Sequence, residues 1–346
     1  MTMTVISPPP AEKKVTAADF ESDQEVRWCP GCGDYAILKA VQRTLAEVGA
    51  QKENTVFVSG IGCSSRFPYY ISTYGFHTIH GRAPAVATGL KLAQPDLDVW
   101  LVTGDGDGLS IGGNHLLHVL RRNLNIQLLL FNNEIYGLTK GQFSPTSRVG
   151  TRSPSTPLGS VDMPLSPTLF ALGAGARFVA RTVDNQQAHM VTMLKRAHAH
   201  QGTSFVEIFQ NCVVYNDGVF DEFTDKSVAP DRQLLAEHGK PLTFGREKNQ
   251  GLRLKPNALE LEVVTIGENG VTTADVLVHD ERNRALASLL GSLHPPDFPQ
   301  VLGVLYCNPA PTYEDAVFGQ MKAAANTGPK DLNSLMRTGR TWTVAG

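Results

Sequence analysis

Short apolar runs alternate with amphipathic stretches through the first two thirds of the chain. Brief runs rich in Val, Ile, Leu and Phe are typical of strands buried on both faces. They predict strands at 55–59, 99–103, 126–131, 178–180 and 205–209. Apolar residues at helical spacing predict helices at 34–48, 84–93, 114–122, 168–173 and 186–200. This alternation predicts an α/β fold in which a mostly parallel sheet carries helices on both faces.

The helix predicted at 34–48 has recognisable ends. Asp34 stands at a plausible N-cap position, and Gly49 follows the last apolar residue of the stripe. The apolar stripe at helical spacing consists of Ile37, Ala40, Val41, Leu45 and Val48. We therefore expect one face of this helix to pack on the sheet.

The pattern changes after Phe244. Apolar alternation at 261–266 and 274–279 predicts a β-hairpin, followed by a helix at 280–293 and a last strand at 302–307. The sequence thus suggests a disordered or extended tail at 1–19, a main domain at 20–243 and a C-terminal extension at 244–346 that packs on a partner subunit. The Ser/Thr/Pro/Gly-rich stretch at 139–165 is long enough for a functional loop, and we expect it to act as a lid.

Composition excludes several classes of protein. Hydrophobic residues make up 42% of the chain and charged residues 18%, with a net charge of −2, which is ordinary for a folded soluble domain. No block of basic residues suggests binding to nucleic acid, and no apolar run approaches the roughly 18 residues of a membrane span. The first residues lack a basic stretch followed by an apolar one, so we expect a cytoplasmic protein.

Four chemically useful residues come directly after predicted strands: Cys63, Asp105, Asn133 and Cys212. Parallel strands end at a common edge of the sheet, and ligands of open α/β sheets bind at that edge. The sequence therefore predicts that these four side chains share one rim.

A glycine-rich segment, GDGDG at 104–108, precedes an Asn-Asn pair at 132–133, with 25 residues between GDG at 104–106 and the pair. One strand–helix–strand unit separates Asp105 from Asn133, which makes the two strands parallel and brings both side chains to one edge. Carboxylate and amide oxygens suit Mg²⁺, and glycines let the backbone approach a diphosphate. A structural glycine-rich turn is the alternative. No stretch matches the G-x-G-x-x-G nicotinamide fingerprint.

Cys29 and Cys32 form a CxxC motif directly before the first predicted helix. A thioredoxin-like redox pair is disfavoured because the polar stretch before the motif is not a buried strand. A four-cysteine zinc site and an iron–sulfur cluster both remain consistent with the spacing. Two histidines three residues apart, His115 and His118, are more typical of an ordinary helix face than of a metal site.

Five motifs, taken in order, resemble the β subunits of 2-oxoacid:ferredoxin oxidoreductases, most closely those that use 2-oxoglutarate. The motifs are WCPGCGDYAIL, IGCSSRFPYY, HTIHGRAPAVATG, GDGDGLSIGGNHLLHVLRRN and NNEIYGLTKGQFSPT, and the resemblance covers roughly residues 20–230. It implies the thiamine-diphosphate-binding fold. It also implies a 4Fe–4S cluster on Cys29, Cys32, Cys63 and Cys212, with Cys307 left as a buried inert thiol.

The resemblance further implies a Mg²⁺ ion held by Asp105, Asn133 and the carbonyl of Ile135. The residues it places around thiamine diphosphate are Ile61, Gly62, Cys63, Ser64, His80, Gly104, Asp105, Gly106, Asp107, Asn133, Ile135, Gly137, Leu138 and Thr139. Arg66 follows Cys63 by three residues, and its guanidinium is a candidate partner for the distal carboxylate of 2-oxoglutarate.

The activity implied is the CoA-dependent oxidative decarboxylation of a 2-oxoacid, with electrons passed through the cluster to ferredoxin, or the reverse reaction. Thiamine enzymes also need an activating glutamate that the family carries on a separate domain. An α subunit is therefore implied as partner, in an (αβ)₂ assembly. Two alternatives are a non-redox thiamine-diphosphate decarboxylase subunit with a structural four-cysteine zinc site, and a non-catalytic nucleotide-binding module.

Overall fold

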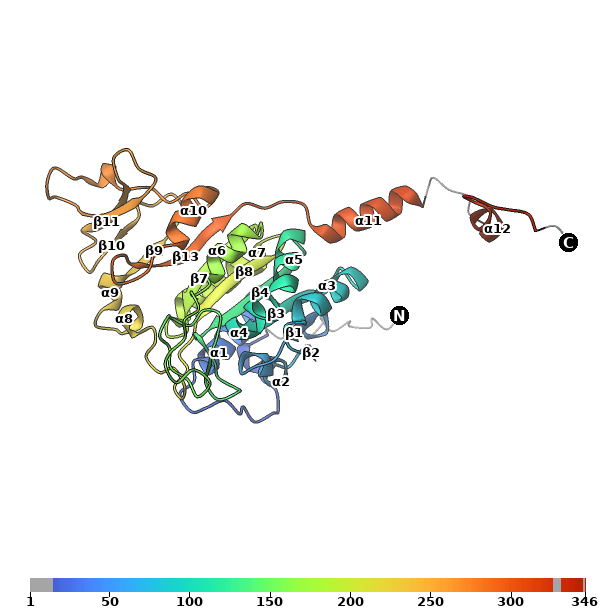
Figure 1. The fold of residues 1–346 in the computed structure, drawn as a ribbon, viewed down its shortest axis with the longest axis horizontal. Helices are drawn as coiled ribbons and strands as arrows, with labels where there is room; N and C mark the ends of the chain where they lie inside the picture. The colour runs from blue at the N-terminus through green and yellow to red at the C-terminus, as the bar shows by residue number, and fades with distance from the viewer. Residues whose placement is uncertain (1–14, 326–330, 345) are drawn as a thin grey trace, which may run out of the picture.

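A computed structural model describes residues 15–325, 331–344 and 346, and its centre is an eight-stranded sheet (Figure 1). The strand order is β2-β1-β3-β4-β8-β7-β13-β9. The bounds are β1 Thr55–Ser59, β2 Tyr74–His77, β3 Asp98–Gly104, β4 Ile126–Asn132, β7 Phe178–Val183, β8 Ser204–Phe209, β9 Gln233–Ala236 and β13 Gln300–Cys307. Neighbouring strands run parallel except β13 and β7, which are antiparallel. The predicted fold class is confirmed.

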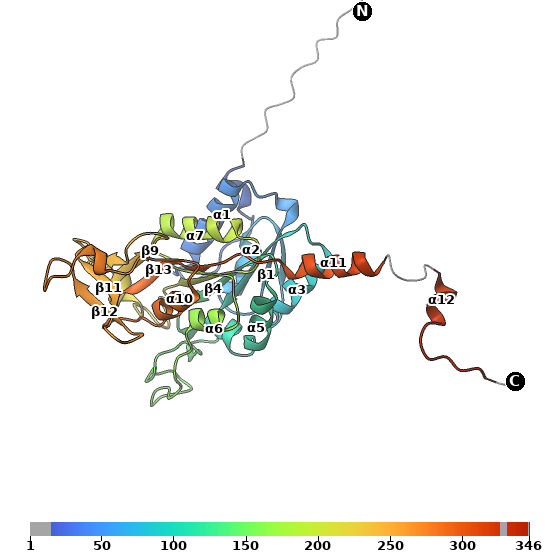
Figure 2. The same ribbon diagram turned by 90° about the horizontal axis from the view of Figure 1, so that it is seen from above.

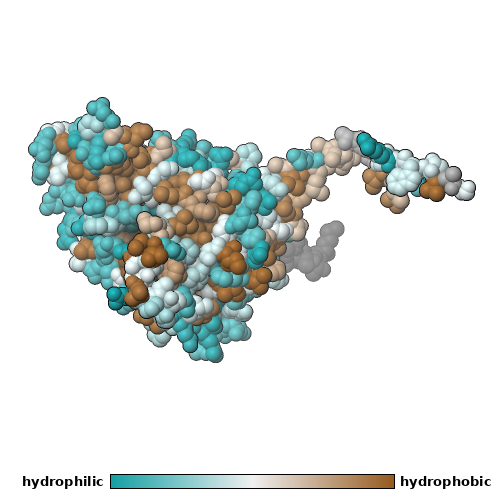
Figure 3. All heavy atoms as spheres, in the orientation of Figure 1, coloured by the Kyte–Doolittle hydropathy of each residue, from teal (hydrophilic) through white to brown (hydrophobic). Residues whose placement is uncertain are grey.

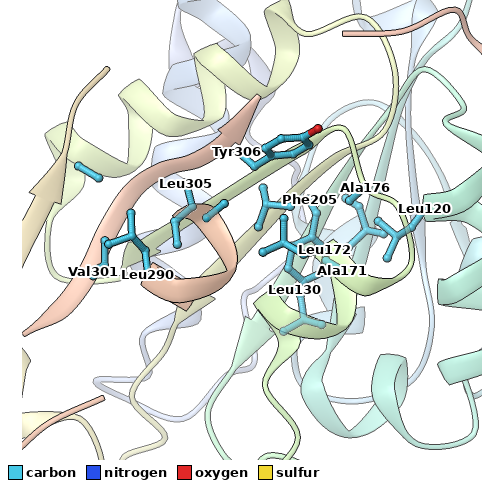
Figure 4. Packing of buried hydrophobic residues seen from close by; sticks show 14 of the residues in the cluster. Leu120, Leu130, Ala171, Leu172, Ala176, Phe205, Leu290, Val301, Leu305 and Tyr306 are labelled. Carbon is cyan, nitrogen blue, oxygen red and sulfur yellow. The ribbon is translucent and has the colours of Figure 1, made fainter. Parts of the chain in front are cut away.

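Helices cover both faces of this sheet (Figure 2). On one face lie α1 Asp34–Val48 and α7 Gln187–Ala199, which enclose one apolar cluster with the sheet. On the other lie α3 Ala83–Ala93, α5 Gly113–Arg122, α6 Pro167–Gly173 and α10 Arg284–Gly291, which enclose a second cluster. Figure 4 shows part of the second cluster, where Leu130 and Phe205 of the sheet meet Leu172 of α6.

The remaining elements, apart from the 12-residue helix at Tyr313–Ala324, are short. The helices are α2 Phe67–Tyr70, α4 Asp105–Leu109, α8 Asp221–Thr224, α9 Ala229–Arg232, α11 Tyr313–Ala324 and α12 Leu332–Met336. The 3₁₀ helices are η1 Ala17–Phe20, η2 Lys52–Asn54, η3 Ser64–Arg66 and η4 Thr273–Asp275. Two small sheets consist of β5 Ile135–Tyr136 with β6 Gln142–Phe143, and of β10 Thr243–Phe244, β11 Gln250–Leu254 and β12 Leu261–Thr265.

The helix predicted at 34–48 has the predicted bounds, but its first turn differs from the prediction. Gly33 is the N-cap, and Asp34 is the first helical residue, with a side chain that is only 1% exposed. Neither carboxylate oxygen of Asp34 makes a hydrogen bond of ordinary geometry within the described residues. Asp34 therefore does not cap the helix.

The predicted hairpin beyond Phe244 is wrong. Its first strand, β12, pairs with β11, whereas residues 274–279 form no strand and contribute a single bridge between Val278 and Pro241. The hydroxyl of Thr272 and the carboxylate of Asp275 form a capping box around η4, and this local hydrogen bonding competes with strand pairing.

The predicted boundary at 243/244 does not separate two structural units. Strand β13 pairs with β7 and β9 inside the central sheet, because its continuous apolar sequence is buried on both sides. At the other end, residues 1–14 of the predicted tail lie outside the described residues. Residues 17–20 form η1, and Phe20 is fully buried in the α1 cluster, so this part of the predicted tail is folded onto the main domain.

Helix α11 runs outward from the body of the molecule (Figure 1). Its Phe318 and Met321 are exposed, as are Trp342 and Val344 further along the chain. Figure 3 shows apolar residues along this segment. In the part of the chain that the structure describes, no helix is both long and apolar enough to span a bilayer.

A buried ion pair joins the central strands under the rim. Arg181 of β7 and Glu207 of β8 are each 1% exposed, and the Arg181 Nε–Glu207 Oε2 distance is 2.8 Å. Glu207 also accepts hydrogen bonds from Thr168 at 2.8 Å and from Asn132 at 2.9 Å. The carboxylate therefore holds β4, β7, β8 and α6 together.

We expect Glu207→Gln to lower the free energy of unfolding by about 3–5 kcal/mol, because it leaves the Arg181 guanidinium charged, buried and unpaired. Urea denaturation measures this change. The half-exposed pair of Arg253 and Glu262 is the control, and Glu262→Gln should cost at most about 1 kcal/mol. Equal losses for the two variants would contradict the role given to the buried pair.

Candidate functional site

Two adjoining cavities lie at the carboxyl ends of β1, β3, β4 and β8, on the predicted rim. The first, about 100 Å³, is named here the glycine-loop cavity. It is lined by Asp34, Ile61, Gly62, Cys63, Ser64, His80, Gly104, Asp105, Gly106, Asp107, Phe131, Asn133, Ile135, Tyr136, Gly137, Leu138, Thr139 and Gln210. Every residue predicted to contact thiamine diphosphate thus lies around one cavity.

The second cavity, about 180 Å³, is named the cysteine cavity. It is lined by Arg27, Trp28, Cys29, Cys32, Cys63, Arg66, Asn133, Gly137, Leu138, Gln210, Cys212, Val213, Val214 and Tyr215. The four cysteines predicted as cluster ligands therefore meet here. Larger cavities of about 320 and 850 Å³ lie elsewhere, but neither brings thiols and the glycine-rich segment together.

Asp105 is buried at the start of α4, with 2% of its surface exposed. Its Oδ2 accepts hydrogen bonds from Ser144 and Thr146, both at 2.6 Å. Burial raises the pKa of Asp105 to about 6, although these two hydroxyls act in the opposite direction. The hydroxyls belong to the long 139–165 loop, so the start of that loop is fastened to the rim.

The two asparagines after β4 have different surroundings. Asn132 is buried against Glu207 and Thr146, which makes it a structural residue. Asn133 faces both cavities, and its Nδ2 donates to Gln210 Oε1 at 2.8 Å. This bond fixes the amide so that Oδ1, which also accepts the Ile135 N–H at 3.2 Å, is the atom left for a cation.

Asp107, the second aspartate of the glycine-rich segment, joins three loops. Its Oδ1 accepts from His80 Nδ1 at 2.5 Å and from the backbone N–H groups of Gly81 and Ile61 at 2.7 and 3.1 Å. Its Oδ2 accepts from Thr103 at 2.7 Å. The carboxylate is therefore occupied by the chain itself and orients the loops that line the glycine-loop cavity.

Gly106 has no room for a side chain. An added Cβ would lie 2.3 Å from the Tyr136 ring, whose hydroxyl donates to the Gly106 carbonyl at 2.8 Å. The close packing presses α4 against the segment that carries Asn133 and Ile135. The glycine therefore permits the two halves of the candidate metal site to approach each other.

The cysteine cavity is closed by aromatic and glycine residues. The Trp28 indole donates to the Cys63 carbonyl at 2.7 Å and packs edge-on against Tyr70, with ring centroids 4.8 Å apart. A Cβ on Gly137 would stand 3.4 Å from Cys63 Sγ and 3.6 Å from Cys212 Sγ. The absence of a side chain at Gly137 thus keeps open the space between these two thiols.

Burial raises the pKa of the Cys63 thiol to about 12, and it raises the pKa of Cys32 further. These thiols stay protonated until metal ions displace the protons. Within residues 15–325, 331–344 and 346, no three Cys, His, Asp or Glu side chains lie close enough to hold a single ion. The four thiols surround the cavity without meeting at a point.

Sequence reasoning missed several residues of the site. Gln210 stands outside the five motifs. Asp34, Ser144 and Thr146 stand inside them, but the sequence does not show that Asp34 lines a cavity or that the two hydroxyls bind Asp105. Arg66, predicted to meet substrate, lines the cysteine cavity and not the glycine-loop cavity. Its Nε donates to the Tyr70 hydroxyl at 2.8 Å.

Known proteins resemble this chain along most of its length. Residues 60–208 match the family described as thiamine pyrophosphate enzyme, C-terminal TPP binding domain. The 2-oxoglutarate oxidoreductase subunit KorB of Mycobacterium tuberculosis is 50% identical over 342 residues, covering 97% of this chain and 90% of that protein. Subunit beta of 2-oxoacid:ferredoxin oxidoreductase 1 of Aeropyrum pernix is 45% identical over 206 residues, covering 60% of this chain and 65% of that protein.

A solved structure extends the similarity to three dimensions. The 2-oxoglutarate:ferredoxin oxidoreductase from Magnetococcus marinus, with 2-oxoglutarate, coenzyme A and succinyl-CoA bound, matches with a TM-score of 0.76 and 33% identity. The match covers 95% of this chain and 97% of that chain.

The occupied carboxylate of Asp107 leads to a stability prediction. Asp107→Asn should lower the free energy of unfolding by about 1.5–3 kcal/mol, because His80 and the backbone donors lose their charged acceptor and the amide nitrogen replaces the oxygen that accepts from Thr103. Thermal unfolding measures the loss. Asp162→Asn, on an exposed side chain, is the matched control and should unfold like the parent. An Asp107→Asn protein as stable as the parent would show that these hydrogen bonds do not hold the loops.

Proposed function

Because the chain belongs to the β subunits of 2-oxoglutarate:ferredoxin oxidoreductases, we propose that it binds thiamine diphosphate with Mg²⁺ and one 4Fe–4S cluster in its two adjoining cavities. The chain is a subunit of an oxidoreductase, which disfavours the non-redox decarboxylase and the nucleotide-binding module. The observation that carries the proposal is the position of four thiols beside the glycine-loop cavity.

The glycine-loop cavity fits the diphosphate and its metal ion. Asp105, Asn133 and the Ile135 carbonyl supply oxygen ligands of the kind that Mg²⁺ prefers, and phosphate and water complete such sites. The close approach at Gly106 brings these ligands together. Asp34 also lines this cavity, and its buried oxygens, which make no hydrogen bond of ordinary geometry to the residues that the structure describes, suit a cavity that receives a polar ligand.

The cysteine cavity fits the cluster. Its donor set is four cysteine sulfurs, and the space that Gly137 leaves beside Cys63 and Cys212 would be filled by any larger residue. Zinc in a four-cysteine site holds each sulfur about 2.3 Å away and leaves no cavity between them. An opening of about 180 Å³ is better suited to a cluster of four irons and four sulfides.

When bound, thiamine diphosphate supplies an electron sink for decarboxylation of a 2-oxoacid, and the cluster supplies one-electron transfer. The chain's own residues position these groups. Asp107 and His80 set the loop around the glycine-loop cavity, Ser144 and Thr146 hold Asp105, and Trp28 ties the CxxC segment to Cys63. Gly137 and Leu138 line both cavities, so no more than one layer of residues separates them.

An α subunit completes the site in this proposal. It would supply the glutamate that activates the cofactor and contribute to an (αβ)₂ assembly that uses CoA and ferredoxin. Exposed apolar residues at the glycine-loop cavity are a suitable docking surface: Leu138 lines the cavity, and Ile79 and Ile111 lie beside His80 and Gly81. The segment beyond β13, with Phe318 and Met321 exposed on α11, is a second candidate contact and retains a partner-binding role for the C-terminal end.

We expect anaerobically purified holoenzyme to contain iron and acid-labile sulfide, with broad absorption at about 400 nm. Replacing Cys29, Cys32, Cys63 or Cys212 by Ala should abolish or convert this signal, because each removes one thiolate ligand. Cys307→Ala is the matched control, since Cys307 lies near His200 and away from both cavities. Zinc without sulfide in the parent, or a full 4Fe–4S signal in Cys63→Ala, would refute the assignment.

Arg66 is retained as a candidate for the second carboxylate of 2-oxoglutarate. It lines the cysteine cavity together with Cys63, and the Tyr70 hydroxyl accepts a hydrogen bond from its Nε. The two terminal nitrogens of its planar guanidinium are the groups left for a carboxylate.

Arg66→Met should lower kcat/KM for 2-oxoglutarate by roughly 10- to 150-fold, as expected for loss of a charge-assisted bond of about 1.5–3 kcal/mol. 2-Oxobutyrate, which lacks the distal carboxylate, should react almost as well as with the parent enzyme. Steady-state kinetics on the two substrates measure the ratio. Equal losses on both substrates would assign Arg66 to the cluster environment or to subunit contact.

A further inference from the structure

Gln210 joins the two cavities. It follows β8 directly, is 1% exposed, and lines both the glycine-loop cavity and the cysteine cavity. Its backbone N–H donates to the Asn132 carbonyl at 2.9 Å, which continues the β4–β8 pairing by one residue. The side chain therefore starts from a fixed point between the two sites.

The side-chain amide of Gln210 is fully engaged. Its Oε1 accepts from Asn133 Nδ2 at 2.8 Å, and its Nε2 donates to Cys32 Sγ at 3.3 Å and to the Asn211 carbonyl at 2.6 Å. Only this orientation of the amide satisfies all three contacts, because the carbonyl of Asn211 accepts and Asn133 Nδ2 donates. The amide group thus has a direction, from Asn133 towards Cys32.

A continuous chain of hydrogen bonds results. It begins at Asn133, whose Oδ1 is a proposed Mg²⁺ ligand, and passes through its Nδ2 to Gln210 and on to Cys32 Sγ, a proposed cluster ligand. In a chain of this kind each bond polarises the next.

We propose that Gln210 is a positioning residue that couples the metal–diphosphate site to the cluster, an inference that rests on the proposed function. Its acceptor oxygen turns Asn133 so that Oδ1 faces the Mg²⁺ site. Its N–H stabilises negative charge on Cys32 Sγ, and hydrogen bonds to cluster sulfurs help to set the reduction potential.

The coupling has a defined sign. A cation at Asn133 Oδ1 makes Nδ2 a stronger donor, which strengthens the Gln210 N–H bond to Cys32 and stabilises the reduced cluster. Binding of Mg²⁺ and thiamine diphosphate therefore raises the cluster potential. By linkage, the reduced cluster strengthens binding of the cofactor by the same factor.

Two variants of the holoenzyme separate the two halves of this role. Gln210→Met removes both the acceptor and the donor at similar length, whereas Gln210→Glu keeps an acceptor for Asn133 and removes the N–H to Cys32. Gln186→Met is the matched control, because its amide pairs with Gln233 outside both cavities. The measurements are iron and sulfide content, the cluster midpoint potential by redox titration with electron paramagnetic resonance, and cofactor affinity by calorimetry.

In Gln210→Met we expect a full cluster whose reduction equilibrium is at least tenfold less favourable, a downward shift of about 59 mV for one electron. Cofactor affinity should fall about 2- to 10-fold, as for loss of one neutral hydrogen bond. Gln210→Glu should show the lowered potential with affinity closer to the parent. The rise in potential on adding Mg²⁺ and thiamine diphosphate to the parent should disappear in Gln210→Met.

The outcomes distinguish this inference from the proposed function. A parent enzyme without iron and sulfide overturns the proposed function and this inference with it. A full cluster with the same potential in the parent, Gln186→Met and Gln210→Met overturns the inference alone. If Gln210→Met does not assemble a cluster, the parent enzyme still tests the inference. A cluster midpoint potential in the parent that is the same with and without Mg²⁺ and thiamine diphosphate would exclude the coupling.

Discussion

The parallel pairing of β1, β3, β4 and β8 is the constraint on which the site depends. The register pairs Ser59 with Val102, Gly104 with Phe131, and Asn132 with Phe209, so the four strands end nearly level. Each loop that carries a functional residue begins at one of these ends. A shift of register in one pair would separate thiols from carboxylate, because every residue displaced moves a side chain by about 3.3 Å and to the other face of the sheet.

Much of the site could be predicted from the sequence because its functional residues follow the carboxyl ends of strands that are easily recognised. Cys63, Asp105 and Asn133 follow short apolar runs whose character as strands is unambiguous, and the crossover rule then brings them to one edge. The second aspartate of the segment, Asp107, was expected to face the cofactor. In the structure, the Asp107 carboxylate accepts hydrogen bonds from backbone and side-chain donors of the chain itself. Sequence spacing cannot tell a carboxylate that binds a ligand from one that binds the chain.

The unpredicted parts depend on contacts distant in sequence. Gln210 is a polar residue after a strand, and its importance follows only from Asn133 and Cys32, which lie 77 and 178 residues away. Strand β13 was expected in a separate extension, yet it lies in the central sheet, because its partners are chosen by tertiary packing and not by neighbours in the chain. The apolar pattern at 274–279 predicted a strand, but the capping box at η4 holds the start of this segment in a 3₁₀ helix.

The wall between the two cavities has a consequence for how such a protein can change over evolutionary time. Five residues line both cavities: Cys63, Asn133, Gly137, Leu138 and Gln210. A substitution at any of them changes both cavities and must be compatible with both. Substitutions in contact are seldom additive, and an acceptable change at one of these positions will usually depend on the residues present at the others. We therefore expect the residues of this wall to change slowly and in coordinated sets during evolution. Residues that line only one cavity can change independently of the other cavity.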